Sequence, residues 1–310
     1  MFNSEILIKN QQIYLSILKE KKVELFIKRE DEIHPFVSGN KFRKLKYNIK
    51  KAQEQKLATL LTFGGAYSNH IAATAFATKI SGLKSIGIIR GDELANDIHR
   101  TLKQNSTLKN AVENGMELKF VSRETYRKKS SERFIEILKQ EYGEVYIVPE
   151  GGTNELAVKG CEEILTSEDE KFNYICCAVG TGGTISGLIN SAKEHQKIIG
   201  FPALKGDFLK EEICKYSKRN NHWDLELNYH FGGYGKFDRE LVTFINQFKE
   251  KTGIPLDPIY TGKMLYGILD KVAKNDFPPY SKILAIHTGG LQGIEGANER
   301  LRKKDEEIIK

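Results

Sequence analysis

Residues 174–191 read YICCAVGTGGTISGLINS. The apolar run 174–179 has the length and composition of a buried strand. A glycine-rich turn follows it at once, and a helical pattern runs from Ile185 to about His195. A strand, a tight turn and a helix in this order form half of a βαβ unit, from which parallel sheets are built.

The same alternation occurs along the rest of the chain. Further strands are expected at residues 59–63, 85–89, 116–121, 145–148, 198–200 and 283–287. Helical patterns cover residues 69–80, 131–141 and 239–252, and a last helix is expected after residue 290. The pattern predicts an α/β protein with mainly parallel sheets and helices on both faces. In such sheets ligands bind at the carboxyl ends of the strands, so the turns that follow strands are where functional residues are expected.

Composition excludes several classes of function. The chain has 310 residues and a formal net charge of +7, and its basic clusters at 127–129 and 302–304 are short. Solvated helix surface explains such clusters, so no nucleic-acid partner is expected. No apolar run reaches the roughly 18 residues of a membrane span, and residues 1–9 lack a signal-peptide core. We therefore expect no membrane partner and a cytoplasmic protein.

Cysteine and histidine spacing gives no sign of a metal site. The four cysteines, at positions 161, 176, 177 and 214, form no C-x-x-C pair, and the seven histidines show no H-E-x-x-H spacing. Buried free thiols are the expected state of the cysteines, and no metal is expected.

A pair of lysines follows a Gly-Asn turn in residues 38–45, SGNKFRKL. Asn40 is expected to cap a helix that begins at Lys41, which places Lys41 and Lys44 on one face. The positive end of the helix dipole and the neighbouring cation both lower the pKa of Lys41, which favours an amine nucleophile or base. From the spacing alone, a basic surface helix is the simpler interpretation.

Two turns that follow expected strands could bind anions. Residues 64–70, GGAYSNH, offer backbone amides at a helix start together with the Ser68 and Asn69 side chains, which suits a carboxylate. Residues 180–184, GTGGT, let the backbone wrap closely around a phosphate. The second turn matches neither the P-loop nor the G-x-G-x-x-G pattern, so a phosphate-bearing ligand other than ATP or NAD is favoured. A purely structural role remains an alternative for both turns.

Six short motifs occur in a characteristic order. They are GNKFRK at 39–44, GGAYSNH at 64–70, PEGGTN at 149–154, GTGGT at 180–184, YTGK at 260–263 and HTGG at 287–290. In this order they resemble the family of D-cysteine desulfhydrases and 1-aminocyclopropane-1-carboxylate (ACC) deaminases. The resemblance runs from about Lys28 to Gly293. It implies a fold-type II pyridoxal-phosphate (PLP) enzyme, similar to the tryptophan synthase β subunit, with two three-layer αβα domains and mainly parallel sheets.

The resemblance also assigns cofactor residues. It implies that Lys41 binds PLP as a Schiff base and later removes the α-proton of the substrate. Asn69 would contact the phenolic oxygen of the ring, and Lys44 would be a second lysine beside the cofactor. The phosphate would be bound by Gly180, Thr181, Gly182, Gly183 and Thr184.

Substrate residues follow from the same resemblance. Ser68, Asn69 and the His70 amide would receive the substrate carboxylate, and Tyr234 and Tyr260 would face the reacting part of the substrate. With Lys41, the catalytic residues expected are Ser68, Tyr234 and Tyr260. The substrate itself would be a small amino acid.

The resemblance further implies how the chain is divided. Residues 1–52 and 151–310 would build a large PLP-binding domain, and residues 53–150 would form a small domain inserted in it. The cofactor would lie between the two. A homodimer is expected by analogy.

The reaction depends on two threonines. ACC deaminases typically carry glutamate at the position of Thr261, facing the pyridine nitrogen, and leucine at the position of Thr288. A neutral hydroxyl at that nitrogen makes a weaker electron sink than a carboxylate does, which favours expulsion of a β-thiolate over opening of a cyclopropane ring. We therefore expect PLP-dependent β-elimination, with D-cysteine giving pyruvate, ammonia and hydrogen sulfide and with Thr288 as the partner of the nitrogen.

Rival functions remain open at this point. Ala66 and Tyr67 replace the Val/Ile-Gln pair found in many members of the family, which leaves the preferred β-substituent open. An ACC deaminase giving 2-oxobutyrate is the alternative within the enzyme class. A non-catalytic PLP-binding protein and a nucleotide-binding protein are the alternatives outside it.

Overall fold

The computed structural model describes residues 2, 6–206 and 208–310. The strands are β1 (Asn10–Ile13), β2 (Glu24–Lys28), β3 (Thr59–Gly65), β4 (Lys84–Arg90), β5 (Met116–Val121), β6 (Tyr146–Val148), β7 (Tyr174–Val179), β8 (Lys197–Pro202), β9 (Trp223–Leu225) and β10 (Lys282–Ile286). The helices are α1 (Ser16–Lys21), α2 (Asn40–Glu54), α3 (Asn69–Ile80), α4 (Ile98–Gln104), α5 (Ser106–Glu113), α6 (Arg123–Arg127), α7 (Glu132–Tyr142), α8 (Glu155–Glu162), α9 (Gly183–Ser191), α10 (Leu209–Cys214), α11 (Arg239–Thr252), α12 (Thr261–Ala273) and α13 (Gly293–Arg302).

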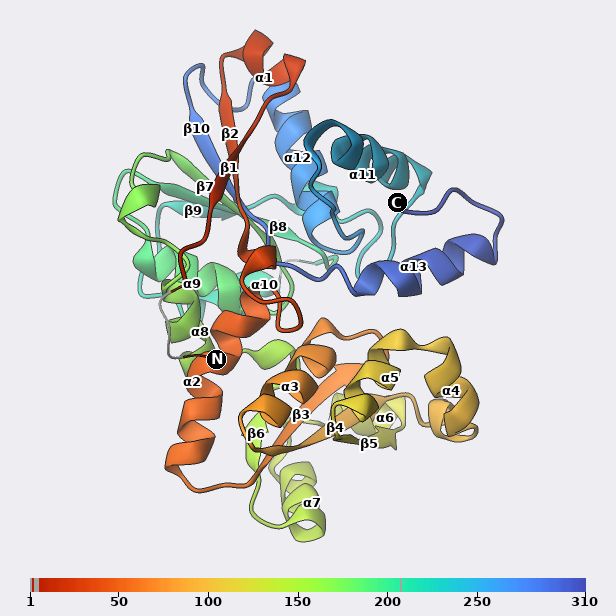
Figure 1. Ribbon diagram of the computed structural model, residues 1–310. Helices are drawn as coiled ribbons and strands as arrows, with labels where there is room; N and C mark the ends of the chain where they lie inside the picture. Colours follow the sequence, from red (N-terminus) through yellow and green to blue (C-terminus); the bar gives the residue numbers. More distant parts are fainter. Residues whose placement is uncertain (1, 3–5, 207) are drawn as a thin grey trace.

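Two sheets organise the chain. The larger has six strands in the order β1-β2-β10-β7-β8-β9, and all its neighbours run parallel except β1 and β2. The smaller has four parallel strands in the order β5-β4-β3-β6. Figure 1 shows the larger sheet in the upper part of the molecule, the smaller sheet below it, and α2 beside the junction.

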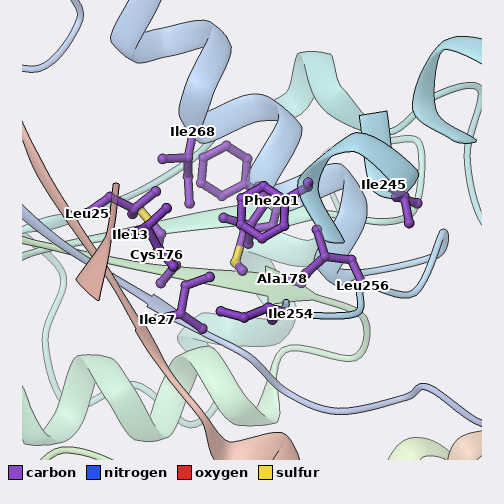
Figure 2. Packing of buried hydrophobic residues seen from close by; sticks show 14 of the residues in the cluster. Ile13, Leu25, Ile27, Cys176, Ala178, Phe201, Ile245, Ile254, Leu256 and Ile268 are labelled. Carbon is purple, nitrogen blue, oxygen red and sulfur yellow. The ribbon is translucent and has the colours of Figure 1, made fainter. Parts of the chain in front are cut away.

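Strand β7 shows why the larger sheet is covered on both faces. Side chains alternate along a strand, so a strand buried on both faces needs apolar residues at every position. Cys176 and Ala178 pack with α11 and α12 in one cluster, part of which Figure 2 shows. Ile175, Cys177 and Val179 pack with α9 and α10 on the opposite face. Burial on both faces therefore explains the unbroken apolar run in the sequence.

The smaller sheet is built in the same way. Leu61 and Phe63 of β3 pack with α6 and α7. On the other face Leu60 packs with α2 and α3. Both sheets are thus three-layered, which confirms the α/β class predicted from the sequence. The parallel strands β3, β7 and β10 each end in a glycine-containing turn.

A buried ion pair links the last residue of β2 to the segment that precedes β7. The Lys28 ammonium lies 2.7 Å from the Asp169 carboxylate, and both side chains are at most 2% exposed. The same carboxylate accepts hydrogen bonds from the Asn10 side chain at 2.7 Å and the Thr166 backbone at 2.8 Å. The Asp169 carboxylate thus has donors from three different segments of the chain.

Buried free thiols were expected for all four cysteines, and this holds for three of them. Cys161, Cys176 and Cys177 are buried and Cys214 is exposed, and all four are free. Burial raises the pKa of the Cys161 thiol to about 11 and that of Cys177 to about 12. The three interior thiols are therefore protonated at neutral pH. No helix of the described residues is long and apolar enough to cross a membrane.

The structure also contains elements that the sequence patterns did not predict. Strands β1, β2 and β9 were missed. The polar sequence NQQI of β1 and the three-residue length of β9 explain two of them, whereas β2 reads ELFIK and carried an apolar run that was overlooked. The helix after β7 begins at Gly183 and ends at Ser191, earlier at both ends than expected. The strand and helix at Tyr174–Val179 and Arg239–Thr252 are confirmed to the residue.

Candidate active site

A pocket lies where the carboxyl ends of strands from both sheets meet. Its empty volume is about 600 Å³, including the open space at its mouth. Nine of the site residues expected from the sequence line it, and they are Lys41, Lys44, Asn69, Gly180, Thr181, Gly182, Thr184, Tyr260 and Thr288. The turns that follow β3, β7 and β10 therefore converge, as the rule for parallel sheets predicts.

Helix α2 brings both lysines to the pocket, but its cap differs from the expected one. The helix begins at Asn40, and Gly39, with φ of 60°, precedes it. A Cβ on Gly39 would lie 2.0 Å from the carbonyl oxygen of Thr288, so only glycine allows this approach. The expected capping role of Asn40 is therefore wrong. Its side chain instead donates to the Thr184 hydroxyl at 2.9 Å.

The two lysines differ in their partners. Lys44 Nζ donates to the Thr153 hydroxyl at 2.9 Å and to the Gly151 carbonyl at 3.1 Å, and its side chain is 2% exposed. Among the described residues, Lys41 Nζ donates only to the side-chain oxygen of Asn40, at 3.3 Å. Burial and the charge of Lys44 lower the pKa of Lys41 to about 7. Lys41 therefore has fewer hydrogen-bond partners than Lys44, and a much larger share of its amine is uncharged at neutral pH than in an ordinary lysine.

The turn after β7 forms a cradle for an anion. Gly182 has φ of 87°, and α9 begins at the next residue, which turns the first amides of that helix toward the pocket. Thr181 Oγ1 lies 2.6 Å from the Thr153 hydroxyl, which ties the cradle to the turn after β6. Of the five residues expected here, only Gly183 does not line the pocket. A Cβ on it would lie 2.8 Å from the Thr153 hydroxyl.

The turn after β3 contributes an amide side chain. Asn69 Oδ1 is buried and has no hydrogen-bond partner among the described residues. A buried amide oxygen without a partner is costly and marks a place where a ligand can complete the hydrogen bonding. Asn69 is therefore the clearest sign in this turn that the pocket receives a polar molecule.

Ser68 and His70, which flank Asn69, do not line the pocket. Ser68 caps α3, accepting the Ile71 amide at 3.4 Å. The His70 ring is 1% exposed and its Nε2 lies 2.8 Å from the Thr62 hydroxyl. Burial and the charges of Lys41 and Lys44 hold the pKa of His70 well below its usual range. The ring is therefore neutral and carries no charge that could attract an anion. Anion binding by this turn would rely on its backbone amides.

Two tyrosines of the larger domain segment, Tyr234 and Tyr260, are in contact with each other. The rings of Tyr234 and Tyr260 meet edge to face with centroids 6.3 Å apart, and Tyr234 is half exposed. Burial and the neighbouring Tyr234 raise the pKa of Tyr260 well above 10. Tyr260 therefore keeps its proton at neutral pH. Tyr260 lines the pocket, whereas Tyr234 is not among the residues that line it.

Asp257 orients the segment that carries Tyr260, a role that the sequence patterns did not reveal. The Asp257 carboxylate accepts the backbone amides of Ile259, Tyr260 and Thr261 at 2.8 to 2.9 Å. It also accepts the Thr261 hydroxyl at 2.7 Å, and Thr261 is fully buried. Thr261 is therefore turned away from the pocket. Of the two threonines on which the expected reaction depends, Thr261 and Thr288, only Thr288 lines the pocket.

The turn after β10 places Thr288. His287 Nε2 lies 2.8 Å from the Pro255 carbonyl, and its Nδ1 accepts the Gly289 amide at 3.3 Å. His287 thus joins the turn of Thr288 to the segment before Asp257. The described lining also includes Ser38, Gly151, Gly289, Gly290 and Gln292, which were not predicted. The glycine pairs in PEGGTN and HTGG, each directly after a strand, were the signal that could have found most of them.

Comparison with known proteins places this geometry in a family. Residues 8–289 match the family model described as "Pyridoxal-phosphate dependent enzyme". A putative ACC deaminase of Pyrococcus horikoshii is 32% identical over 304 residues, which cover 92% of this chain and 90% of that protein. A bifunctional D-cysteine desulfhydrase/ACC deaminase of Arabidopsis thaliana is 33% identical, over 87% of this chain and 73% of that protein. A crystal structure of an ACC deaminase homologue superposes with a TM-score of 0.82 at 28% identity, covering 96% of this chain and 94% of the other.

Proposed function

Because this chain belongs to the pyridoxal-phosphate dependent enzymes, we propose that it catalyses β-elimination on D-cysteine, which yields pyruvate, ammonia and hydrogen sulfide. One observation carries the choice of reaction. Thr288, a neutral hydroxyl, lines the pocket, while the Thr261 hydroxyl is bound to Asp257. A hydroxyl beside the cofactor nitrogen suits the departure of a thiolate, which carries its own negative charge away.

The residues of the pocket fit the cofactor. The partnerless Asn69 Oδ1 marks an amide free to contact a ring substituent. The cradle at Gly180–Thr184, with the start of α9, suits a phosphate. Lys41, with its lowered pKa, suits covalent attachment through a neutral amine. When bound, PLP supplies an electron sink for charge that develops on the substrate Cα.

The side chains of the pocket then have separate tasks in the proposal. Lys41 Nζ holds the cofactor and, once released, moves the proton at the substrate Cα. Lys44 stays bound to Thr153 and keeps the pKa of Lys41 low through its charge. The backbone amides of Asn69 and His70, at the start of α3, bind the substrate carboxylate, since the Ser68 amide already donates to the Gly65 carbonyl at 3.0 Å. Tyr260, protonated at neutral pH, donates a hydrogen bond to the leaving sulfur, with Tyr234 beside it.

A substrate panel tests the proposal. Purified enzyme with PLP is incubated separately with D-cysteine, L-cysteine, β-chloro-D-alanine and ACC, and keto acids and sulfide are quantified. The proposal expects pyruvate and sulfide from D-cysteine. Formation of 2-oxobutyrate from ACC without sulfide from D-cysteine would overturn it in favour of the deaminase, the activity in the name of the Pyrococcus horikoshii protein. Retained cofactor with no turnover of any compound would favour a binding protein instead.

The pKa of Lys41 leads to a pH prediction for the protein freed of cofactor. The neutral amine is the attacking form, and it exists above the pKa, which burial and Lys44 lower to about 7. The rate of PLP attachment is therefore expected to rise as the pH rises through about 7 and to level off above it. Stopped-flow absorbance of the bound cofactor between pH 5.5 and 9 measures this rate. A midpoint near 10, the value of an ordinary lysine, would contradict the low pKa.

The division of the chain and its assembly belong to the same proposal. We propose that residues 1–52 and 151–310 move as one body and residues 53–150 as another, with the cofactor between them. The two sheets support this division, since β3 to β6 lie within residues 53–150. A homodimer and a cytoplasmic location stay predictions. Light scattering coupled to size-exclusion chromatography tests the dimer.

A further inference from the structure

Lys263, in the first turn of α12, is a buried cation that has no part in the proposed reaction. Its side chain is 1% exposed, and the positive end of the helix dipole further disfavours a cation at this position. Burial lowers the pKa of Lys263 to about 8, against the opposing charges of Asp257 and Asp238. The amine is therefore mostly charged at neutral pH. A buried charge of this kind is unfavourable unless hydrogen bonds offset its loss of water.

The hydrogen bonds of Lys263 go to a single loop, residues 230–236, which we call the tyrosine loop. Lys263 Nζ donates to the carbonyl of His230 at 2.8 Å and to the carbonyl of Gly233 at 3.0 Å. Each of these carbonyls also closes a backbone turn. The Gly233 amide donates to the first at 3.0 Å, and the Lys236 amide donates to the second at 3.2 Å. One ammonium therefore joins two successive turns of the loop.

The backbone of the tyrosine loop needs such a contact. Four of its seven residues have a positive φ, and they are Phe231, Gly232, Gly233 and Gly235. A bulky residue such as Phe231, with φ of 51°, keeps this conformation only where its surroundings impose it. Arg300 also donates to the loop, at the Gly235 carbonyl, but it does so from the exposed surface. Lys263 holds the loop from the interior.

The tyrosine loop is connected to the pocket through two aromatic rings. Tyr234, in the second turn of the loop, packs edge to face on Tyr260 with ring centroids 6.3 Å apart. Tyr260 directly precedes α12 and lines the pocket. The start of α12 thus carries one ring to the pocket, and Lys263, three residues later, holds the loop whose tyrosine packs on that ring. A displaced loop would therefore leave Tyr260 without this packing.

We propose that Lys263 is a positioning residue, which holds Tyr234 against Tyr260 and so keeps the Tyr260 hydroxyl directed at the leaving group. This inference rests on the proposed β-elimination, in which Tyr260 donates to the departing sulfur. A thiolate is a much stronger base than chloride, so it gains more from a hydrogen-bond donor as it leaves. The effect of Lys263 should therefore depend on the leaving group. A residue that only stabilised the fold would affect both leaving groups equally.

Two substrates with different leaving groups test this role. We measure kcat/KM at pH 7 with D-cysteine and with β-chloro-D-alanine. Lys263→Met removes the ammonium but keeps a side chain of similar length, and both loop carbonyls keep their turn hydrogen bonds, so the protein should fold. We expect kcat/KM to fall by about 10-fold with D-cysteine and by less than about twofold with β-chloro-D-alanine. An equal fall with both compounds would overturn the positioning role.

An exposed lysine at the other end of α12 is the matched control. Lys274 follows the helix and pairs with Asp270 at 2.6 Å, and its side chain is 62% exposed. Lys274→Met removes the same charge and is expected to change kcat/KM by less than about twofold with either compound.

A double variant shows whether Lys263 acts through Tyr260. Tyr260→Phe alone is expected to lower kcat/KM with D-cysteine by about 100-fold, because it removes the proposed donor. Adding Lys263→Met to Tyr260→Phe is expected to change the value by less than about twofold, since both substitutions affect one hydroxyl. If the two losses multiply instead, Lys263 acts elsewhere and the inference is wrong.

Failure of the reaction can be told apart from failure of the inference. If the wild type releases no pyruvate from D-cysteine, the proposed function is wrong, and the state of the tyrosine loop then decides the role of Lys263. Trypsin can cut after the exposed Lys236, and the mass of the fragment identifies this cut. Cleavage is expected to be about 10-fold faster in Lys263→Met than in the wild type or Lys274→Met, because a loop that opens more often is cut more often. Equal rates in Lys263→Met and the wild type would show that Lys263 does not hold the loop.

Discussion

Substitution of Lys41 by alanine is expected to lower the rate of keto acid formation by about 10⁴-fold or more. The loss is large because the variant removes the amine that would hold the cofactor and the only group placed to move the proton at Cα in the proposal. Lys44 cannot take over, since its Nζ is bound to Thr153 and Gly151. Pyruvate formation under steady-state conditions measures the effect, and borohydride treatment should no longer fix PLP to the protein.

A lysine on the same helix provides the matched control. Lys46 is on α2 but pairs with Glu163 at 2.6 Å, away from the residues that line the pocket. Lys46→Ala is expected to change the rate by less than about twofold, because partly exposed ion pairs contribute little. Lys41→Ala with more than a hundredth of the wild-type rate would refute the assignment of Lys41.

The second large effect concerns stability. Replacing Asp169 by alanine is expected to lower the free energy of unfolding by about 3–5 kcal/mol, because the Lys28 ammonium would stay buried without its counter-charge. The pair is 2.7 Å apart, with side chains 2% and 1% exposed. The Asn10 amide would lose the same acceptor. Urea unfolding followed by circular dichroism measures the change.

Two variants separate the buried charge from simple loss of a contact. The double variant Lys28→Met/Asp169→Leu removes both charges and is expected to recover most of the loss. Glu124→Ala breaks the exposed pair with Lys128, whose side chains are 66% and 79% exposed, and is expected to cost less than about 0.5 kcal/mol. An Asp169→Ala protein as stable as Glu124→Ala would show that the buried pair contributes nothing.

The apolar runs of the interior strands β3, β4, β7, β8 and β10 predicted the core of the fold. Tyr174–Val179 is apolar on both faces and bounded by glycine, so its limits followed directly. Strand β1 lies at the edge of the larger sheet and has one buried residue of four, so its polar sequence gave no signal. Edge position alone does not decide the outcome: β5 and β6, at the edges of the smaller sheet, were predicted, whereas β2, which lies between β1 and β10, was missed.

The site was predictable only in part, for a different reason. Glycine turns after strands showed where to look, and the motif order pointed to Lys41 and Asn69. The conformation of Gly39 depends on the carbonyl of Thr288, almost 250 residues away, so the true start of α2 could not be deduced locally. Long-range contacts of this kind leave no periodic pattern and no motif in the sequence.

The uneven burial of the thiols makes the protein suited to single-site labelling. A maleimide dye should react with Cys214, since the other three cysteines are enclosed and protonated. Cys214 ends α10, and its neighbour Ile213 lies 3.2 Å from the place of a Cβ on Gly182, in the phosphate cradle. A fluorophore on Cys214 would be attached next to Ile213, the residue that packs against the cofactor-binding turn. Its emission could follow the loading and loss of PLP in solution without any engineered cysteine.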